Sequence, residues 1–98
     1  MKRYRIEIKP TAENDLTQRY QQIAKESPEN AVAWYITIIE GIEALDRLAL
    51  RCPIAPEDID IQRGVRHLII GSYRILYLVE DETVKVLHIR HSRHARKL

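Results

Sequence analysis

Three strand-like segments joined by two-residue connections occupy the C-terminal part of the chain, and their spacing limits the folds available to it. Segments 65–70, 73–80 and 83–90 are rich in apolar and β-branched residues, which strands favour. Gly-Ser at 71–72 and Asp-Glu at 81–82 leave room only for tight hairpin turns. The sequence therefore predicts an antiparallel meander of three strands. Its middle strand is apolar enough to be covered on much of both faces.

One strand and two helices are predicted before this meander. Residues 4–8 alternate apolar and charged side chains, which is the pattern of a half-buried strand. Thr11 is the expected N-cap of a first amphipathic helix. Ser27 is the expected N-cap of a second helix, which begins with proline and runs to about residue 50. The apolar stripe of this second helix is broad enough to pack on the sheet and on the first helix together.

The middle and the end of the second helix carry two further signals. Gly41 costs about 1 kcal/mol relative to alanine inside a helix, and a close approach to the first helix is the expected reason for it. Pro53 and Pro56 end the helix, and 54–62 is predicted to be a loop. The predicted fold class is α+β, in the order β-α-α-β-β-β. A helical hairpin should cover one face of a small, mainly antiparallel sheet and leave the other face partly open.

Length and composition predict a single domain spanning 1–98. The 98 residues are 45% hydrophobic, which is enough for one core. No apolar run approaches the roughly 20 residues of a membrane span, and the charged N-terminus does not resemble a signal peptide. Cys52 is the only cysteine, so it cannot form an intramolecular disulfide. We therefore expect a cytoplasmic protein without a membrane partner, with Cys52 as a partly buried structural residue.

Positive charge is concentrated at the C-terminal end of the chain. Residues 1–62 contain 8 Lys and Arg against 11 Asp and Glu, whereas residues 63–98 contain 8 against 3. All four histidines lie in that second part. Such an asymmetry favours an anionic partner, either nucleic acid or an acidic protein surface. The alternative is a solvated basic edge that only prevents aggregation.

Neither a cofactor nor a metal is expected. The chain has no glycine-rich phosphate loop and no pair of cysteines. His88, His91 and His94 are spaced by three residues, but side chains alternate faces along a strand. His88 and His91 should therefore point apart and could not share a metal ion.

A metal-independent ribonuclease is the enzyme class that these residues could support. His91 or His94 could act as acid or base near neutral pH, and Arg66, Arg74, Arg90 and Arg93 could bind phosphate. Arg74 is a special case because it lies inside the apolar middle strand. An unpaired charge there would be costly, so Arg74 must face the open side of the sheet or pair with a carboxylate.

Two segments of the meander, GSYRILY at 71–77 and VKVLHIRH at 84–91, resemble the RelE/ParE superfamily of toxins from type II toxin–antitoxin modules, also called plasmid stabilization proteins. The helical hairpin after a first strand, Pro53 and GVRHL at 64–68 match as well. The resemblance covers nearly the whole chain and implies the same fold. It also implies a bacterial toxin that is encoded with a cognate antitoxin, whose C-terminal segment wraps around it.

The RelE branch of this superfamily implies a ribosome-dependent endoribonuclease that cuts mRNA, which is the alternative function. By position, Arg74 matches the branch's central-strand arginine and Arg66 lies near its basic residue on the preceding strand. Arg93 or His94 lies near its C-terminal arginine. The chain departs from this branch, because no tyrosine follows Tyr77 and the first meander strand has no lysine pair.

The ParE branch is the closer match in its short basic C-terminus and long second helix. It implies inhibition of DNA gyrase through protein contact, without a catalytic centre in the toxin. Contact with target or antitoxin is then expected at Arg74 and at residues near the C-terminus, namely Arg90, His91, Arg93, His94, Arg96 and Lys97. A homodimer and a toxin–antitoxin heterotetramer are both compatible with this branch. A third hypothesis is a member that has lost toxicity and survives as a binding partner.

Overall fold

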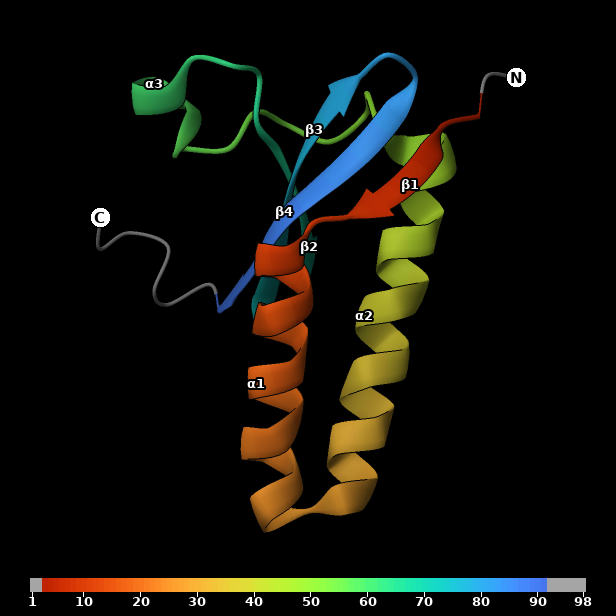
Figure 1. Cartoon of the computed structure of the whole chain (residues 1–98), viewed down its shortest axis with the longest axis vertical. Coiled ribbons are helices and arrows are strands. Elements are labelled where there is room, and N and C mark those ends of the chain that lie inside the picture. Colours follow the sequence, from red (N-terminus) through yellow and green to blue (C-terminus); the bar gives the residue numbers. More distant parts are fainter. Residues whose placement is uncertain (1–2, 92–98) are drawn as a thin grey trace.

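A four-stranded sheet with a helical hairpin on one face makes up residues 3–91, which are the residues described in the computed structural model (Figure 1). In chain order the elements are β1 (Arg5–Ile8), α1 (Pro10–Glu26), α2 (Pro28–Leu48), α3 (Asp58–Ile61), β2 (Arg66–Ile70), β3 (Tyr73–Glu80) and β4 (Thr83–His91). The strand order is β1-β4-β3-β2, with β1 parallel to β4 and the other pairings antiparallel. The predicted α+β fold and the meander are confirmed. None of the helices within these residues is long and apolar enough to cross a membrane.

The starts of the two long helices differ in how well the sequence predicted them. The Ser27 side chain accepts a hydrogen bond from the backbone N–H of Asn30 at 3.2 Å, so Ser27 is the N-cap of α2 as predicted. The prediction for Thr11 was wrong, because α1 begins at Pro10 and its N-cap is Lys9. Proline suits the first helical position, where no N–H donor is needed. The hydroxyl of Thr11 instead donates to the carbonyl of Leu87 on β4 at 2.7 Å.

The segment predicted to be a loop, 54–62, contains the single-turn helix α3, so that prediction was wrong in this part. This short helix is stabilised by hydrogen bonds to one of its side chains, because a single turn has few backbone hydrogen bonds of its own. Asp58 Oδ1 accepts hydrogen bonds from the backbone N–H groups of Arg63, Gly64 and Val65, at 3.0, 2.8 and 2.9 Å. The Asp58 carboxylate therefore holds residues 63–65 against the start of α3.

Gly41 allows a close approach between α2 and the sheet, not between the two helices as predicted. A Cβ atom at this position would lie 2.0 Å from Cδ1 of Ile70, at the end of β2. An alanine could be accommodated only if the end of the Ile70 side chain moved. The glycine therefore lets α2 pass over the β2–β3 hairpin at short distance.

The main core lies between the hairpin and the sheet, and a smaller one lies on the opposite face. Tyr77 is fully buried in the main core, and its hydroxyl donates to the carbonyl of Ala49 at 2.7 Å. The largest fully buried aliphatic side chains of this core are Ile38, Ile42, Leu45, Ile75, Val84 and Val86. The smaller core consists of Ala55, Val65, Leu76 and Leu78, with Leu87 packed against it. The second face is therefore partly covered by segment 55–65, and only the rest of it is open.

The distal half of the hairpin is not covered by the sheet (Figure 1). The α2 stripe was predicted to pack on the sheet and on α1 together, and this is confirmed only for the half of α2 that contains the buried residues Ile38, Ile42 and Leu45. In the distal half, Val32 and Tyr35 remain 46% and 42% exposed. They face residues of α1 across a groove, and a substantial apolar surface is left in contact with solvent.

Candidate functional site

A change of register in the meander decides which residues share the face opposite the hairpin. The pairing of β3 with β4 shifts by one residue between Leu76 and Tyr77, and this places Arg90 directly across from Arg74. Leu76 belongs to the smaller core and is paired with His88, so His88 lies on the same face as the two arginines. His91 pairs with Tyr73, on the face of the hairpin. The prediction that His88 and His91 point to opposite faces is confirmed.

Arg74 forms a buried ion pair with Glu57, which lies just before α3. Both residues are only 4% exposed. Arg74 Nη1 donates to Glu57 Oε1 at 3.2 Å, and Nη2 donates to Oε2, which makes the pair bidentate. The sequence predicted that Arg74 must face the open side of the sheet or pair with a carboxylate, and the pairing with a carboxylate is confirmed. Its guanidinium is consequently not part of the exposed surface, where the sequence had placed a contact residue.

His67 on β2 completes the contacts of Arg74. Its Nδ1 lies 2.9 Å from Arg74 Nη1, and a guanidinium has only donors, so this nitrogen must be the acceptor. Burial, followed by the positive charge of Arg74, lowers the pKa of the His67 imidazole, while Glu57 acts weakly in the opposite direction. His67 is thereby held neutral. His67 was not among the predicted site residues. Its position was a possible signal, because Ile69 pairs with Arg74 and a residue two positions away on the same strand points to the same face.

Arg90 is the second arginine that contacts Glu57, with Nη1 at 3.6 Å from Oε2. Like charges directly opposite each other on neighbouring strands are unfavourable, and the Glu57 carboxylate lies between them. Burial alone would raise the pKa of Glu57, but hydrogen bonds, above all from Arg74, and the charges of Arg74 and Arg90 outweigh it and lower the pKa. The group of two guanidiniums and one carboxylate therefore keeps a net positive charge. Arg90 carries that charge to the surface, because its side chain is 34% exposed.

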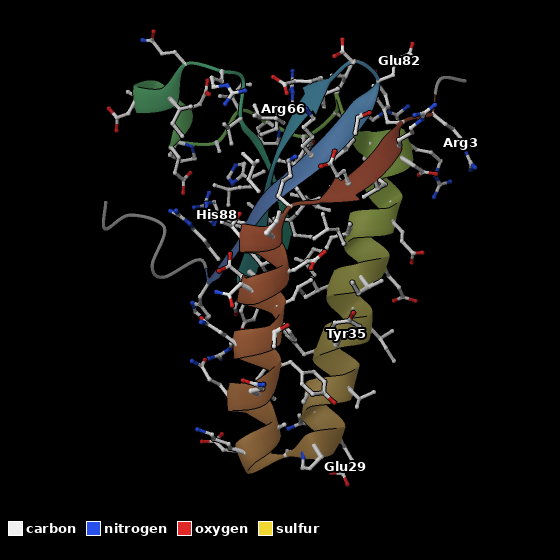
Figure 2. The ribbon with its side chains drawn as sticks, in the orientation of Figure 1. Arg3, Glu29, Tyr35, Arg66, Glu82 and His88 are labelled. Atoms are coloured by element: carbon white, nitrogen blue, oxygen red, sulfur yellow. The ribbon has the colours of Figure 1, made fainter. Side chains whose placement is uncertain are left out.

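A cleft of about 310 Å³ opens beside these charges. Its walls combine apolar side chains of the smaller core and α3 with the side chains of Arg90, His88, Glu57 and Asp60; the apolar ones are Ile61, Val65, Leu76 and Leu87. His88 lines the cleft near the start of α1 (Figure 2), and its Nδ1 lies 3.3 Å from Asp15 Oδ2 on that helix. The cleft can therefore accept an apolar group and place a neighbouring anion next to Arg90.

Of the described residues predicted for a nuclease, only Arg74 and Arg90 lie on the face of this cleft. Arg66 pairs with Tyr77 and so lies on the hairpin side of the sheet, where its Nη1 donates to the carbonyl of Cys52 at 2.6 Å. His91 is also on the hairpin side, with its ring centroid 5.1 Å from that of Tyr73. Among the described residues, the sheet thus separates Arg74 and Arg90 from Arg66 and His91. Arg93, His94, Arg96 and Lys97 lie outside the described residues.

Tyr73 is the centre of a second polar and aromatic group that sequence reasoning missed. Its hydroxyl accepts a hydrogen bond from Arg19 Nε, and its ring packs edge to face against Trp34 at 5.4 Å between centroids. His91 packs on the same ring. The contributing residues come from α1, α2, β3 and β4, so no local sequence pattern could have indicated the group.

An apolar groove lies between the distal halves of α1 and α2. It has a volume of about 430 Å³ and is lined by Leu16, Thr17, Tyr20, Gln21, Val32 and Tyr35. Figure 2 shows Tyr35 in the distal part of the hairpin, where its ring packs edge to face on Tyr20 with 6.0 Å between centroids. Ile36 extends the apolar surface next to the groove and is 51% exposed.

The comparisons with known proteins assign the family. The ParE toxins of type II toxin–antitoxin systems (parDE) match residues 6–96, which is nearly the whole chain. The chain belongs to the ParE toxin family. It is a toxin of the ParE type, as the resemblance of its meander implied. No curated protein sequence is significantly similar to the chain.

Two solved structures have a similar fold. The chromosomal ParDE toxin–antitoxin system from P. aeruginosa is similar with a TM-score of 0.75 and 21% identity, over 90% of this chain and 95% of that one. The RelBE2 toxin–antitoxin complex from Mycobacterium tuberculosis is similar with a TM-score of 0.59 and 28% identity, over 91% of this chain and 98% of that one. The fold of the ParE toxin described here is therefore shared by both branches of the superfamily.

Proposed function

We propose that this ParE toxin inhibits DNA gyrase by binding to it and has no catalytic centre of its own. The single observation that supports protein contact over RNA cleavage is the state of Arg74. The branch that cuts mRNA uses a central-strand arginine, whereas here that arginine is 4% exposed and bound on both Nη atoms by Glu57. While Glu57 holds it, this guanidinium cannot bind an RNA phosphate, and Asp60 in the lining of the adjacent cleft cancels the positive charge that would attract a polyanion in place of Glu57. Membership of the ParE family supports the same choice of target.

The contact with gyrase is proposed at the end of β4. Arg90 presents its side chain there, on the face away from the hairpin, and His91 follows on the other face. The remaining residues proposed for this contact are Arg93, His94, Arg96 and Lys97. A run of basic residues with no Asp or Glu among positions 90–98 suits an acidic protein surface and speeds the encounter with it.

Supercoiling by purified gyrase tests this proposal. Added toxin should lower the rate at which relaxed plasmid is supercoiled, and Arg90→Gln should require a higher toxin concentration for the same inhibition. In parallel, mRNA cleavage should be measured in a reconstituted translation system. Unchanged supercoiling at saturating toxin would refute the gyrase target, and ribosome-dependent cleavage that Arg74→Ala abolishes would establish the alternative function.

A cognate antitoxin is the proposed occupant of the groove on the hairpin. Val32, Tyr35 and Ile36 expose apolar surface there, and a small domain with a thin margin of stability gains from a partner that covers it. An amphipathic helix is the element that fits a groove between two helices. Both similar structures are of toxin–antitoxin systems.

Neutralisation in cells tests the antitoxin site. Co-expression of the antitoxin encoded beside the toxin should restore growth, and Val32→Glu should weaken that rescue because it places a charge in the apolar groove. The matched control is Ile59→Glu on α3, because Ile59 is 77% exposed and lies outside the groove. Equal rescue of both variants would exclude this groove as the antitoxin site.

A further inference from the structure

Arg74 and Arg90 together form a positively charged site of the kind that binds oxyanions, and the carboxylate of Glu57 occupies it. Two arginines lie directly across from each other on neighbouring strands, and the carboxylate of Glu57 contacts both of them. Such a pair without an anion would be unfavourable. The anion does not come from one of the four strands, since Glu57 belongs to segment 55–65. This segment follows Ile54, which pairs with the edge of β2, and it covers part of the open face. A side chain of this covering segment thus fills a site that the sheet supplies.

Two features show that Glu57 satisfies this site only in part. Arg74 Nε is buried and has no hydrogen-bond partner within the described residues. Arg90 Nη1 lies 3.6 Å from Glu57 Oε2, which is longer than a hydrogen bond, and its side chain lines the cleft and is about one third exposed. One carboxylate therefore serves two guanidiniums and leaves donors of both unused.

We infer that Arg74 and Arg90 form a carboxylate-binding site whose internal ligand is Glu57, and that an acidic side chain of a partner protein beside an apolar one can take its place. The inference goes beyond the proposed function, because it assigns a ligand class to this pair whatever the target. The cleft beside the pair selects for an apolar side chain next to the acidic one. Ile61, Leu76 and Leu87 accept an apolar side chain, and Arg90 lies at the edge where a neighbouring carboxylate would enter.

The walls of the cleft favour a protein ligand over a nucleic acid. Asp60 adds a second negative charge beside Glu57, so the two arginines and two carboxylates sum to zero and attract only weakly a chain that carries a phosphate at every nucleotide. A planar carboxylate also matches the two parallel donors of a guanidinium, which is how Glu57 itself is bound. A single acidic residue within an apolar segment meets both conditions.

Chemical rescue of Glu57→Ala tests the site, because the atoms lost in this substitution correspond to one acetate ion. Acetate at several times its dissociation constant should raise the Tm of the variant by about 4–8 °C relative to chloride at equal ionic strength. The control is Glu80→Ala, because Glu80 binds two cations, Arg63 and Lys85, at the surface. Acetate should not raise the Tm of Glu80→Ala or of the parent protein in this way. The bulkier trimethylacetate ion should not raise the Tm of Glu57→Ala. A variant that folds only when acetate is present would also support the site.

Three outcomes of this experiment would overturn the inference. The first is an equal effect of acetate on Glu57→Ala and Glu80→Ala, and the second is an equal effect of acetate and trimethylacetate. The third is a larger rise with phosphate than with acetate at equal ionic strength, which would assign the site to phosphate. None of these results depends on gyrase, so the proposed function stands or falls separately.

Exchange of the internal ligand is tested with a leucine-containing hexapeptide that carries a single glutamate. Its affinity for Glu57→Gln should exceed that for the parent protein by about tenfold or more, because the competing internal charge is removed. Affinity should be lost in Arg90→Gln and for the hexapeptide in which glutamine replaces glutamate. Equal binding to the parent protein, Glu57→Gln and Arg90→Gln would show that the pair is a structural ion pair only.

Discussion

The carboxylate of Asp15 on α1 accepts a hydrogen bond from the backbone N–H of Ile89 on β4, at 3.0 Å between Oδ2 and N. β1 pairs with β4 only from Thr83 to Val86, so the edge of β4 is not covered by a strand beyond that point. Thr11, one helical turn before Asp15, provides the next contact by donating to the carbonyl of Leu87. The first turns of α1 thus continue the sheet edge with side chains and block the addition of a foreign strand there.

Asp15→Ala is expected to destabilise the toxin by about 1–3 kcal/mol, because the Ile89 N–H loses its acceptor in a partly buried place. The free energy of unfolding from urea titration measures this. Gln18→Ala is the matched control, because it removes an exposed polar side chain from the same helix. A loss no larger than that of the control would mean that water replaces the carboxylate at this edge.

Gly41→Ala is expected to leave the stability of the protein nearly unchanged. Alanine gains about 1 kcal/mol of helix propensity over glycine, but the new methyl group would meet Cδ1 of Ile70 at 2.0 Å. Moving the end of that side chain away from its rotamer costs roughly 0.5–1.5 kcal/mol, which offsets the gain. In an Ile70→Val background the obstructing carbon is absent, so Gly41→Ala should stabilise by about 1 kcal/mol. Additive effects in the double-mutant cycle would exclude Ile70 as the reason for the glycine.

Short local sequence signals, each spanning only a few residues, were sufficient to predict the fold. The alternation in 4–8, the Ser27-Pro28 start of α2 and the two-residue turns of the meander are local signals, and each is present in the structure. The start of α1 was missed because Pro10 and Thr11 compete for it, and proline fits the first helical turn while the threonine hydroxyl finds a distant partner on β4. Local propensity cannot weigh that long-range bond.

The site could be predicted only in part, because it depends on register and on a segment distant in sequence. The need of Arg74 for a carboxylate follows from its place in an apolar strand, but three acidic residues at 57, 58 and 60 could have supplied it. The structure selects Glu57, since the carboxylate of Asp58 is bound to its own segment. The one-residue shift between β3 and β4 then decides that Arg90 joins Arg74.

Asp58→Ala is expected to loosen the segment that carries Glu57. The hydrogen bond from Val65, together with those from Arg63 and Gly64, lowers the pKa of the Asp58 carboxyl, so the charged acceptor is the form that holds the segment. Hydrogen exchange at these three amides should become faster by at least tenfold in the variant. Asp60→Ala, which changes a neighbouring acidic residue of α3, should leave their exchange unchanged. Equal protection in both variants would show that the segment is held by its packing alone.

The stability of the protein should fall as the pH is lowered from 7 toward 5, and His67 should account for part of that fall. The folded protein holds the pKa of His67 below its ordinary value of 6.5, by burial and by the charge of Arg74. Below that pH the unfolded chain takes up a proton that the folded chain does not, so the contribution of neutral His67 is lost. Glu57, whose pKa is also lowered, adds a loss in the same direction only below its ordinary value of 4.5.

His67→Asn isolates this contribution, because the asparagine carbonyl can accept the hydrogen bond from Arg74 but does not titrate. The free energy of unfolding should be measured by urea titration at intervals between pH 7 and 5 for both proteins. We expect a shallower decrease for the variant, so that the stability difference between the two proteins changes steadily below pH 6.5. Parallel curves would mean that His67 binds protons equally in the folded and unfolded chains. In that case the contact between its Nδ1 and Arg74 would not hold the ring neutral.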